Sequence, residues 1–315
     1  MKGRSFLSEI RTDLALESKN FYFKRNNITK LDGIIANTEE TDIYTKTEVF
    51  IKTKEAAEKI GKPLGNYVTI RSEYIESGLY TEELSIILAE ELKKFIPNLN
   101  KNPLIFVAGL GNRSVTPDAL GPEVVSSLIV TRHLPDKSKK ELSLSHLSAL
   151  APGVLGITGI ESSEIINAVS EKIRPDCIIA IDALASASAS NIGCTIQLSD
   201  TGINPGSGVH NRRTALNEKT LGIPVISVGV PTVSDISTIL SGAFEEILDA
   251  SSLSFPEHEK KEALKNFLNL HSEDSMVTPK NIDAVISRAA VILSRGINLA
   301  VHENLDYASV SDYTS

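Results

Sequence analysis

The chain has 315 residues, 41% of them hydrophobic, with a net charge of −8 and a pI near 5.4. This length allows one large or two small globular domains, and the acidic balance argues against a dedicated nucleic-acid-binding surface while leaving a basic protein substrate possible. We expect no membrane span and no secretory signal, because no apolar stretch is long enough to span a bilayer and the start of the chain lacks the apolar core of a signal. The two cysteines are expected to be small buried residues with reduced thiols, which fits a cytoplasmic protein.

The first third of the sequence predicts an irregular arm, a few antiparallel strands and one helix. Residues 1–41 are mostly polar and lack sustained periodicity. Residues 45–75 alternate between polar and apolar like half-exposed strands, with a turn cluster at 61–66. Residues 81–96 carry apolar side chains at helical spacing, with acids in the first turn and lysines in the last, as the helix dipole favours. These features predict an antiparallel edge and a helix that precede the core.

The rest of the chain alternates strands and helices, the pattern of a doubly wound, mostly parallel α/β sheet flanked by helices. The predicted strands are Leu104–Ala108, Leu142–Leu147, Cys177–Ile181, Thr195–Leu198 and Pro224–Val230. The predicted helices are Glu123–Arg132, Glu161–Ile173, Asp235–Asp249, where Asp235 is a cap, and a last helix launched by Thr278 and Pro279. We expect a single α/β domain over 14–305, with lead-in strands and a helix at 14–98 and the catalytic core at 99–305, and a frayed tail at 306–315.

Two aspartates, Asp118 and Asp182, each follow a predicted buried strand. The carboxyl ends of parallel strands lie at the same edge of an open α/β sheet, so we expect both carboxylates to face one crevice. Two carboxylates brought together can share a proton or hold a metal ion, and either arrangement activates water. Hydrolysis is therefore the first hypothesis, and the alternative that each aspartate only caps the following helix stays open.

A glycine-rich loop connects the first core strand to the helix after it. Gly109 and Gly111 allow a sharp turn, and Asn112 follows them. Ser114 stands where a dinucleotide-binding G-x-G-x-x-G motif needs its third glycine, so nucleotide binding is disfavoured. We predict that this loop shapes a cleft around Asp118.

A second glycine-rich loop covers residues 204–213 and contains Gly206, Ser207, Gly208 and His210. A serine nucleophile with His210 as its base is conceivable here. Ser207 lacks the flanking spacing of a G-x-S-x-G nucleophile elbow, however, so we favour a cleft-shaping role for the loop.

Several long stretches occur together in one order: Gly109-Leu-Gly-Asn-Arg-Ser-Val-Thr-Pro-Asp-Ala-Leu-Gly-Pro122, Ala151-Pro-Gly-Val-Leu-Gly-Ile-Thr-Gly-Ile-Glu161, Ile181-Asp-Ala-Leu-Ala185, Ser199-Asp-Thr-Gly-Ile-Asn-Pro-Gly-Ser-Gly208 and Gly222-Ile-Pro-Val-Ile-Ser-Val-Gly-Val-Pro-Thr232. With Met276-Val-Thr-Pro-Lys280 and the last helix, the chain resembles, over nearly its whole length, the germination proteases of spore-forming bacteria, which degrade small acid-soluble spore proteins. The resemblance implies an aspartic-type endopeptidase, unrelated in fold to pepsin and similar in fold to hydrogenase maturation peptidases. It also implies that the two catalytic aspartates of the family correspond to Asp118 and Asp182.

The resemblance also implies a zymogen and a cellular setting. The family removes a short propeptide at a site with an acid, an apolar residue and alanine, and Arg11-Thr-Asp-Leu-Ala-Leu-Glu17 fits this order. The expected propeptide is 1–13, cut by the protein itself between Asp13 and Leu14. We expect a homotetramer in the cytoplasm of the spore core, with small acid-soluble spore proteins as substrates, no cofactor, no metal, no direct nucleic-acid contact and no membrane contact.

Two positions depart from the family pattern. Ala187 stands where the family often has arginine, and His210 stands where it commonly has glycine. The first departure affects the charge of the substrate pocket, and the second adds a polar group near the aspartates. Two other functions stay open: a metal-dependent maturation peptidase with Asp118, Asp182 and His210 as ligands, and a non-catalytic binder of small spore proteins.

Overall fold

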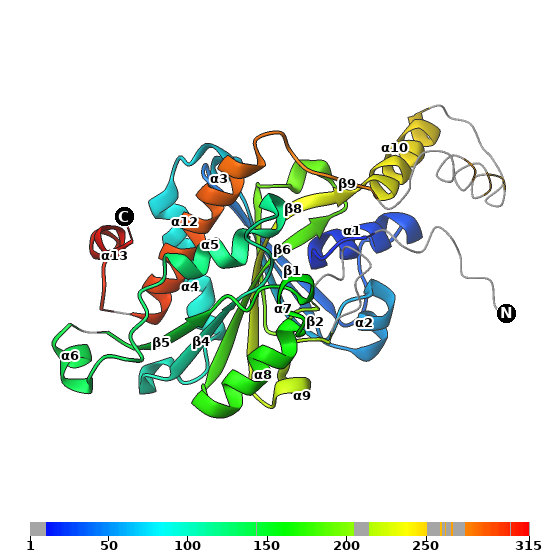
Figure 1. The fold of residues 1–315 in the computed structure, drawn as a ribbon. Coiled ribbons are helices and arrows are strands. Elements are labelled where there is room, and N and C mark those ends of the chain that lie inside the picture. Colours follow the sequence, from blue (N-terminus) through cyan, green and yellow to red (C-terminus); the bar gives the residue numbers. More distant parts are fainter. Residues whose placement is uncertain are drawn as a thin grey trace.

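One mixed sheet organises the molecule (Figure 1). The computed structural model describes residues 11–142, 144–204, 214–250, 259, 262, 266, 275–302 and 304–314. Within them the sheet has the order β1-β2-β3-β7-β8-β6-β4-β5, and β9 pairs with β8. The strands are β1 Ile34–Glu40, β2 Thr45–Ile51, β3 Gly65–Arg71, β4 Leu104–Gly109, β5 His146–Leu150, β6 Cys177–Ser186, β7 Thr195–Ser199, β8 Val225–Asp235 and β9 Met276–Val277.

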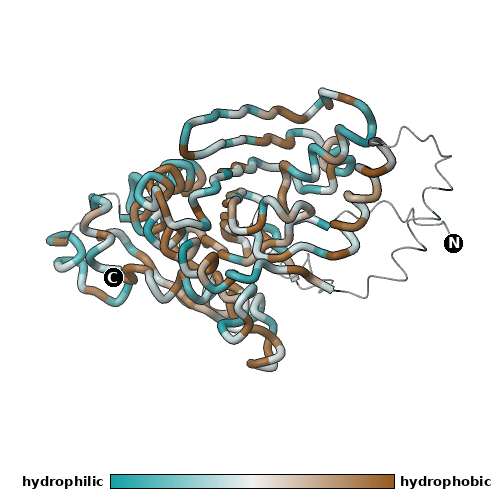
Figure 2. Tube along the Cα trace, turned by 90° about the horizontal axis from the view of Figure 1, so that it is seen from above, coloured by the Kyte–Doolittle hydropathy of each residue, from teal (hydrophilic) through white to brown (hydrophobic). Residues whose placement is uncertain are grey.

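The sheet has a parallel core and an antiparallel extension. Strands β5, β4, β6 and β8 run parallel to one another, whereas β7, β3, β2 and β1 continue the sheet from β8 in antiparallel pairs. Polar and apolar residues alternate along individual strands (Figure 2), as a strand with one buried side requires. The predicted doubly wound α/β fold with an N-terminal antiparallel edge is confirmed.

Helices cover both faces of the sheet (Figure 1). One face packs against α3 Tyr74–Ser77, α4 Thr81–Phe95, α5 Leu120–Ser126 and α12 Ile282–Val301, around inward side chains such as Val107 and Ile181. The opposite face carries two smaller apolar clusters. Helices α8 Ser162–Ile173 and α9 Glu218–Leu221 pack over the parallel strands, and α1 Ala15–Asn26 and α2 Lys54–Ile60 pack over the antiparallel edge. Asp182 belongs to this second face, because its neighbours in β6, Ile181 and Ala183, point into the first.

The N-terminal part is more ordered than the sequence analysis expected. Residues 15–26 form α1, which ends at Asn27 in the left-handed conformation, and residues 34–40 form β1. Six of the seven residues of β1 are exposed, so this strand leaves no alternating pattern in the sequence. Helix α2 is short and is fixed by its ends, because Thr53 caps it and Gly61 terminates it.

The boundaries of some core elements differ from the predicted ones. Helix α5 ends at Ser126 rather than continuing to Arg132, and residues 136–141 form α6, so that β5 begins only at His146. The remaining helices are α7 Leu155–Thr158, α10 Ile236–Ala250 and α13 Tyr307–Tyr313.

The C-terminal part holds the long helix α12 and a short helix instead of a frayed end. Val310 of α13 is fully buried, which explains why this tail is ordered. Helix α12 is long and apolar enough to cross a membrane by length and composition, which the sequence analysis did not anticipate. Because 72% of its most apolar window is buried inside the protein, it has the character of a core helix.

Candidate active site

Asp182 lies inside a strand rather than after one. Strand β6 continues five residues past the predicted end at Ile181, and Asp182 pairs there with Gly229 of β8. The residue is only 7% exposed, and its Oδ1 accepts a hydrogen bond of 2.9 Å from the backbone N–H of Ala183. Since no helix starts at this point, the alternative reading of Asp182 as a helix cap is excluded.

Asp118 ends a short 3₁₀ helix, Thr116–Asp118, in the loop after β4. The loop folds back on itself, because the N–H of Asn112 donates to the carbonyl of Asp118 over 2.9 Å. Gly111 makes this approach possible: its φ is +111°, and a Cβ there would lie 2.0 Å from the Asp118 carbonyl oxygen. Ala119, not Asp118, occupies the N-cap of α5, so Asp118 is not a helix cap either.

The loop that carries Asp118 lies beside the strand that carries Asp182. Its 3₁₀ helix contacts β6 and β8, and the N–H of Leu110 donates to the carbonyl of Ile181 over 2.8 Å. From β4 the chain goes first to β5 on one side and then returns to β6 on the other side, so the strand order reverses at β4. The loop of Asp118 and the residues Ile181 and Asp182 lie at this point. Open α/β sheets place their ligand sites at this point. The sequence therefore brings the two acid-bearing segments to one end of adjacent parallel strands.

The N-terminal arm is docked against the C-terminal end of β6. The N–H of Asp13 donates to the carbonyl of Ala185, and the N–H of Ala185 donates to the Asp13 carboxylate, both over 2.8 Å. Leu14 is only 1% exposed, and Lys62 donates to the carbonyl of Thr12 over 2.8 Å. Burial lowers the pKa of Lys62, although the negative charge of Asp13 opposes this shift. The predicted cleavage segment is thus held in the protein's own structure.

Gln197 of β7 contacts the same segment, and the sequence analysis missed it. Its side-chain Nε2 donates to the carbonyl of Asp13 over 3.0 Å, and its Oε1 accepts from the N–H of Ala15 over 2.7 Å. The one sign of this role in the sequence was an amide side chain in the middle of the predicted strand Thr195–Leu198. In the structure Gln197 is only 6% exposed.

Glu17, in the first turn of α1, is a second anchor of the arm. Glu17 is only 7% exposed, and its carboxylate accepts hydrogen bonds from five donors. They are the hydroxyl of Thr12, the hydroxyl of Ser186 at 2.6 Å, the N–H of Ala187 at 2.8 Å, the N–H of Ser188 at 3.2 Å and the amide of Asn191 at 2.7 Å. Ala187, the position where the family often has arginine, therefore contributes its backbone to a carboxylate site.

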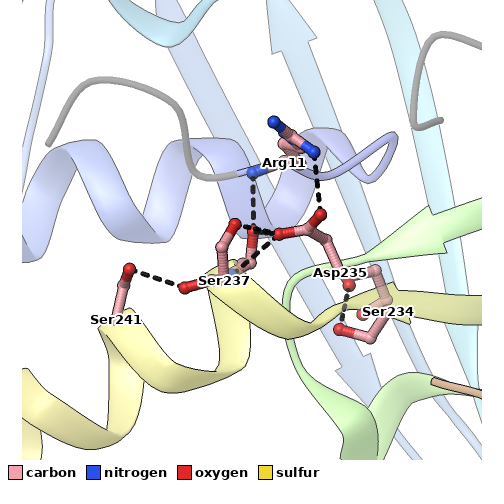
Figure 3. A network of polar contacts seen from close by, with 7 residues as sticks. Arg11, Ser234, Asp235, Ser237 and Ser241 are labelled. Atoms are coloured by element: carbon pink, nitrogen blue, oxygen red, sulfur yellow. Dashed lines mark hydrogen bonds and ion pairs between the residues drawn. The ribbon is translucent and has the colours of Figure 1, made fainter. Parts of the chain in front are cut away.

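An ion pair holds the start of the described arm (Figure 3). The Arg11 guanidinium lies 2.8 Å from the carboxylate of Asp235, which also accepts from the N–H of Thr238 over 2.9 Å and so caps α10, as predicted. Burial alone would raise the pKa of Asp235, but hydrogen bonds from Ser237 and Thr238 and the charge of Arg11 outweigh it and lower this pKa.

The residues predicted in the second glycine-rich loop cannot be placed relative to the two aspartates. Gly206, Ser207, Gly208 and His210 lie outside the described residues. In the part of the chain that the structure describes, no group of three or more His, Cys, Asp and Glu side chains could hold a metal ion. The metal-site hypothesis with His210 as a ligand therefore stays a prediction.

The sequence model of the germination proteases matches residues 11–254 and 252–314. A germination protease of Clostridium perfringens, strain ATCC 13124, is 42% identical over 323 residues, which cover 96% of this chain and 98% of the relative. A germination protease of Geobacillus sp. WCH70 is 37% identical over 361 residues and 97% of each chain. Among solved structures, a NiFe-hydrogenase maturation protease from Thermococcus kodakarensis matches with a TM-score of 0.30 and 19% identity, over 45% of this chain and 80% of its own.

Proposed function

The chain belongs to the germination protease family and is a peptidase, and we propose that it is an aspartic-type endopeptidase that initiates the degradation of small acid-soluble spore proteins during germination. One observation carries this proposal. The loop of Asp118 is hydrogen-bonded to β6 through Leu110 and Ile181, next to the buried Asp182, at the strand-order reversal of the sheet.

The proposed mechanism uses the two aspartates as an acid and a base. Repulsion between two neighbouring carboxylates keeps one of them protonated. The ionised aspartate takes a proton from water while the water oxygen bonds to the scissile carbonyl carbon. The protonated aspartate then gives its proton to the leaving amine nitrogen as the C–N bond breaks. No metal ion, cofactor or acyl-enzyme is required by these steps.

We further propose that the protein is made as a zymogen with residues 1–13 as its propeptide. The docked arm supports this idea, because Asp13 is hydrogen-bonded to Ala185, three residues beyond Asp182 in the same strand. Cleavage between Asp13 and Leu14 would leave Leu14 as the new N-terminus at the start of α1. The acid–apolar–alanine order of this segment agrees with the preference expected for substrates.

The proposed setting is the cytoplasm of the spore core, and the proposed assembly is a homotetramer. Membership in the germination protease family supports the proposed setting, and the resemblance to that family is the ground for the proposed assembly.

The substrate proposal is tested by incubating the protein with a purified small acid-soluble spore protein and mapping the cuts by mass spectrometry. We expect a few defined cuts, each after an acidic residue and before an apolar one. An unrelated folded protein of similar size is the control and should stay intact. An uncut spore protein, or equal degradation of both proteins, would contradict the proposal.

A further inference from the structure

We propose that Gln197 is a catalytic residue of this peptidase, whose side-chain amide positions the peptide group to be cut and stabilises the negative charge that develops on its carbonyl oxygen. This inference rests on the proposed function, and in particular on cleavage between Asp13 and Leu14. It assigns a role to a residue that is neither acid nor nucleophile.

The amide of Gln197 spans the proposed scissile bond. Nε2 donates over 3.0 Å to the carbonyl of Asp13, the carbonyl that water attacks, and Oε1 accepts over 2.7 Å from the N–H of Ala15, one peptide group farther along. A carbonyl can only accept and an amide N–H can only donate, so these two partners fix which end of the side chain faces which group. The donor is therefore directed at the oxygen that becomes an oxyanion.

Gln197 and Asp182 share one face of the sheet. Asp182 pairs with Gly229 in β8, and Gly229 pairs with Gln197 in β7, so the three residues form a row across neighbouring strands. With strands about 4.8 Å apart, the backbones of Asp182 and Gln197 are separated by about 10 Å. The middle position has no side chain, and a Cβ there would lie 2.6 Å from Leu184. The acid and the amide thus lie on the same face of the sheet, on the two sides of a glycine, and the amide contacts the arm.

The surroundings of Gln197 explain why this amide suits the role. The residue is 6% exposed and lies between β3 and β8, so its position is set before a substrate binds. In the described part of the chain, its side-chain hydrogen bonds are the two to Asp13 and Ala15. A buried amide without partners is unfavourable, which means that this position favours an extended peptide backbone lying across it.

Suitable variants separate an effect of Gln197 on cleavage from an effect on the docking of the N-terminal arm. Gln197→Glu keeps the size of the side chain and the acceptor for Ala15, but at neutral pH it cannot donate to the Asp13 carbonyl. Gln197→Leu removes both bonds without adding a charge and serves if the buried glutamate prevents folding. Thr69→Val is the matched control, because Thr69 pairs with Gln197 in β3 and its buried hydroxyl has no hydrogen-bond partner among the described residues.

The experiment follows self-cleavage of the full-length chain by intact mass spectrometry. We expect the cut between Asp13 and Leu14 to slow by about 10²-fold in Gln197→Glu, the loss typical of one oxyanion donor, and to keep its wild-type rate in Thr69→Val. Hydrogen–deuterium exchange of residues 11–17 is then compared between Asp182→Asn and the Asp182→Asn, Gln197→Glu double variant. Equal protection is expected, because the arm stays docked while the chemistry slows.

Three results would overturn the inference. Wild-type cutting rates in folded Gln197→Glu and Gln197→Leu would remove Gln197 from the mechanism and leave the proposed function standing. A slow cut accompanied by lost protection of residues 11–17 would reduce Gln197 to an anchor of the arm. No cut between Asp13 and Leu14 in the wild type would overturn both this inference and the proposed self-processing.

Discussion

Asp13 and Ala185 are joined by two hydrogen bonds, which fix the proposed propeptide boundary to the strand that carries Asp182. The arm is therefore held in place near the acids, and the contacts of Asp13, Gln197 and Glu17 anchor it along successive residues.

Glu17→Ala should destabilise the protein by about 2–3 kcal/mol, the usual cost of losing a buried carboxylate with charge-assisted hydrogen bonds. The change leaves the N–H groups of Ala187 and Ser188 without this acceptor. Chemical denaturation measures the loss, and hydrogen exchange of the 186–191 segment should accelerate. Glu58→Ala is the control: Glu58 is exposed on α2, so its removal should change stability by less than about 0.5 kcal/mol. Equal effects of the two substitutions would show that the Glu17 site does not hold the arm.

Gly111→Ala should abolish peptidase activity because the new Cβ would lie 2.0 Å from the Asp118 carbonyl and displace the loop. The matched control is Gly61→Ala, since Gly61 also has a positive φ, +74°, but nothing lies within 4 Å of a Cβ there. Both variants carry the backbone strain of about 1 kcal/mol, and only the first carries the collision. Peptide hydrolysis at equal concentrations of folded protein compares them. Full activity in Gly111→Ala would mean that the position of Asp118 is unimportant.

Stability should fall as the pH drops below about 6.5, partly because of His302. This histidine is fully buried, its Nδ1 accepts from the N–H of Ser145 over 3.1 Å, and its Nε2 lies 3.0 Å from the carbonyl of Ile129. Burial lowers the pKa of His302 below the ordinary 6.5, although the bond to Ile129 opposes the shift. A lowered folded-state pKa means that the unfolded chain takes up the proton first, so this stabilisation is complete above pH 6.5 and decreases toward the folded-state pKa.

The measurement is the thermal midpoint between pH 7.5 and pH 5, in wild type and His302→Asn. The variant should be less stable at pH 7.5 but should show a shallower loss on acidification. His133→Asn, which changes an exposed histidine, should follow the wild-type curve. Parallel curves for wild type and His302→Asn would exclude the titration of His302 as a cause.

Exhaustive dialysis against a strong chelator should leave peptide hydrolysis unchanged, because the proposed mechanism needs proton transfer by side chains alone. The same protein assayed without dialysis is the reference. Activity that is lost on chelation and regained with one divalent metal ion would favour the metal-dependent alternative, and His210 would then be the first ligand to replace.

Local patterns predicted the core of the fold and the two segments that make up the candidate site. The apolar runs that became β4 and β6, and the glycines before Asp118, carry their signal within a few residues, so the sequence predicted both acid-bearing segments. The strand end at Ile181 was wrong because Asp182 interrupts the apolar run and mostly small residues follow it. Only the pairing with β8 shows that β6 continues through them.

The arm and its partners were beyond the reach of local patterns. Helix α1 is stabilised where Glu17 meets the segment 186–191 and where Ala15 meets Gln197, contacts between residues more than 160 positions apart. Polar side chains such as Gln197 and Ser186 become recognisable as a binding surface only when the sheet places β6 and β7 on either side of β8. Neither position has a periodicity that marks it in the sequence.

If Asp118 and Asp182 together activate water, self-cleavage needs both of them, and N-terminal analysis of the incubated full-length protein tests this requirement. Wild type, Asp118→Asn and Asp182→Asn are incubated under identical conditions, and their folding is checked by circular dichroism. We expect a new N-terminus at Leu14 in the wild type and an intact chain in both folded variants, since each asparagine keeps the size of the side chain but cannot transfer the proton. A new N-terminus at Leu14 that forms at the wild-type rate in either variant would contradict it.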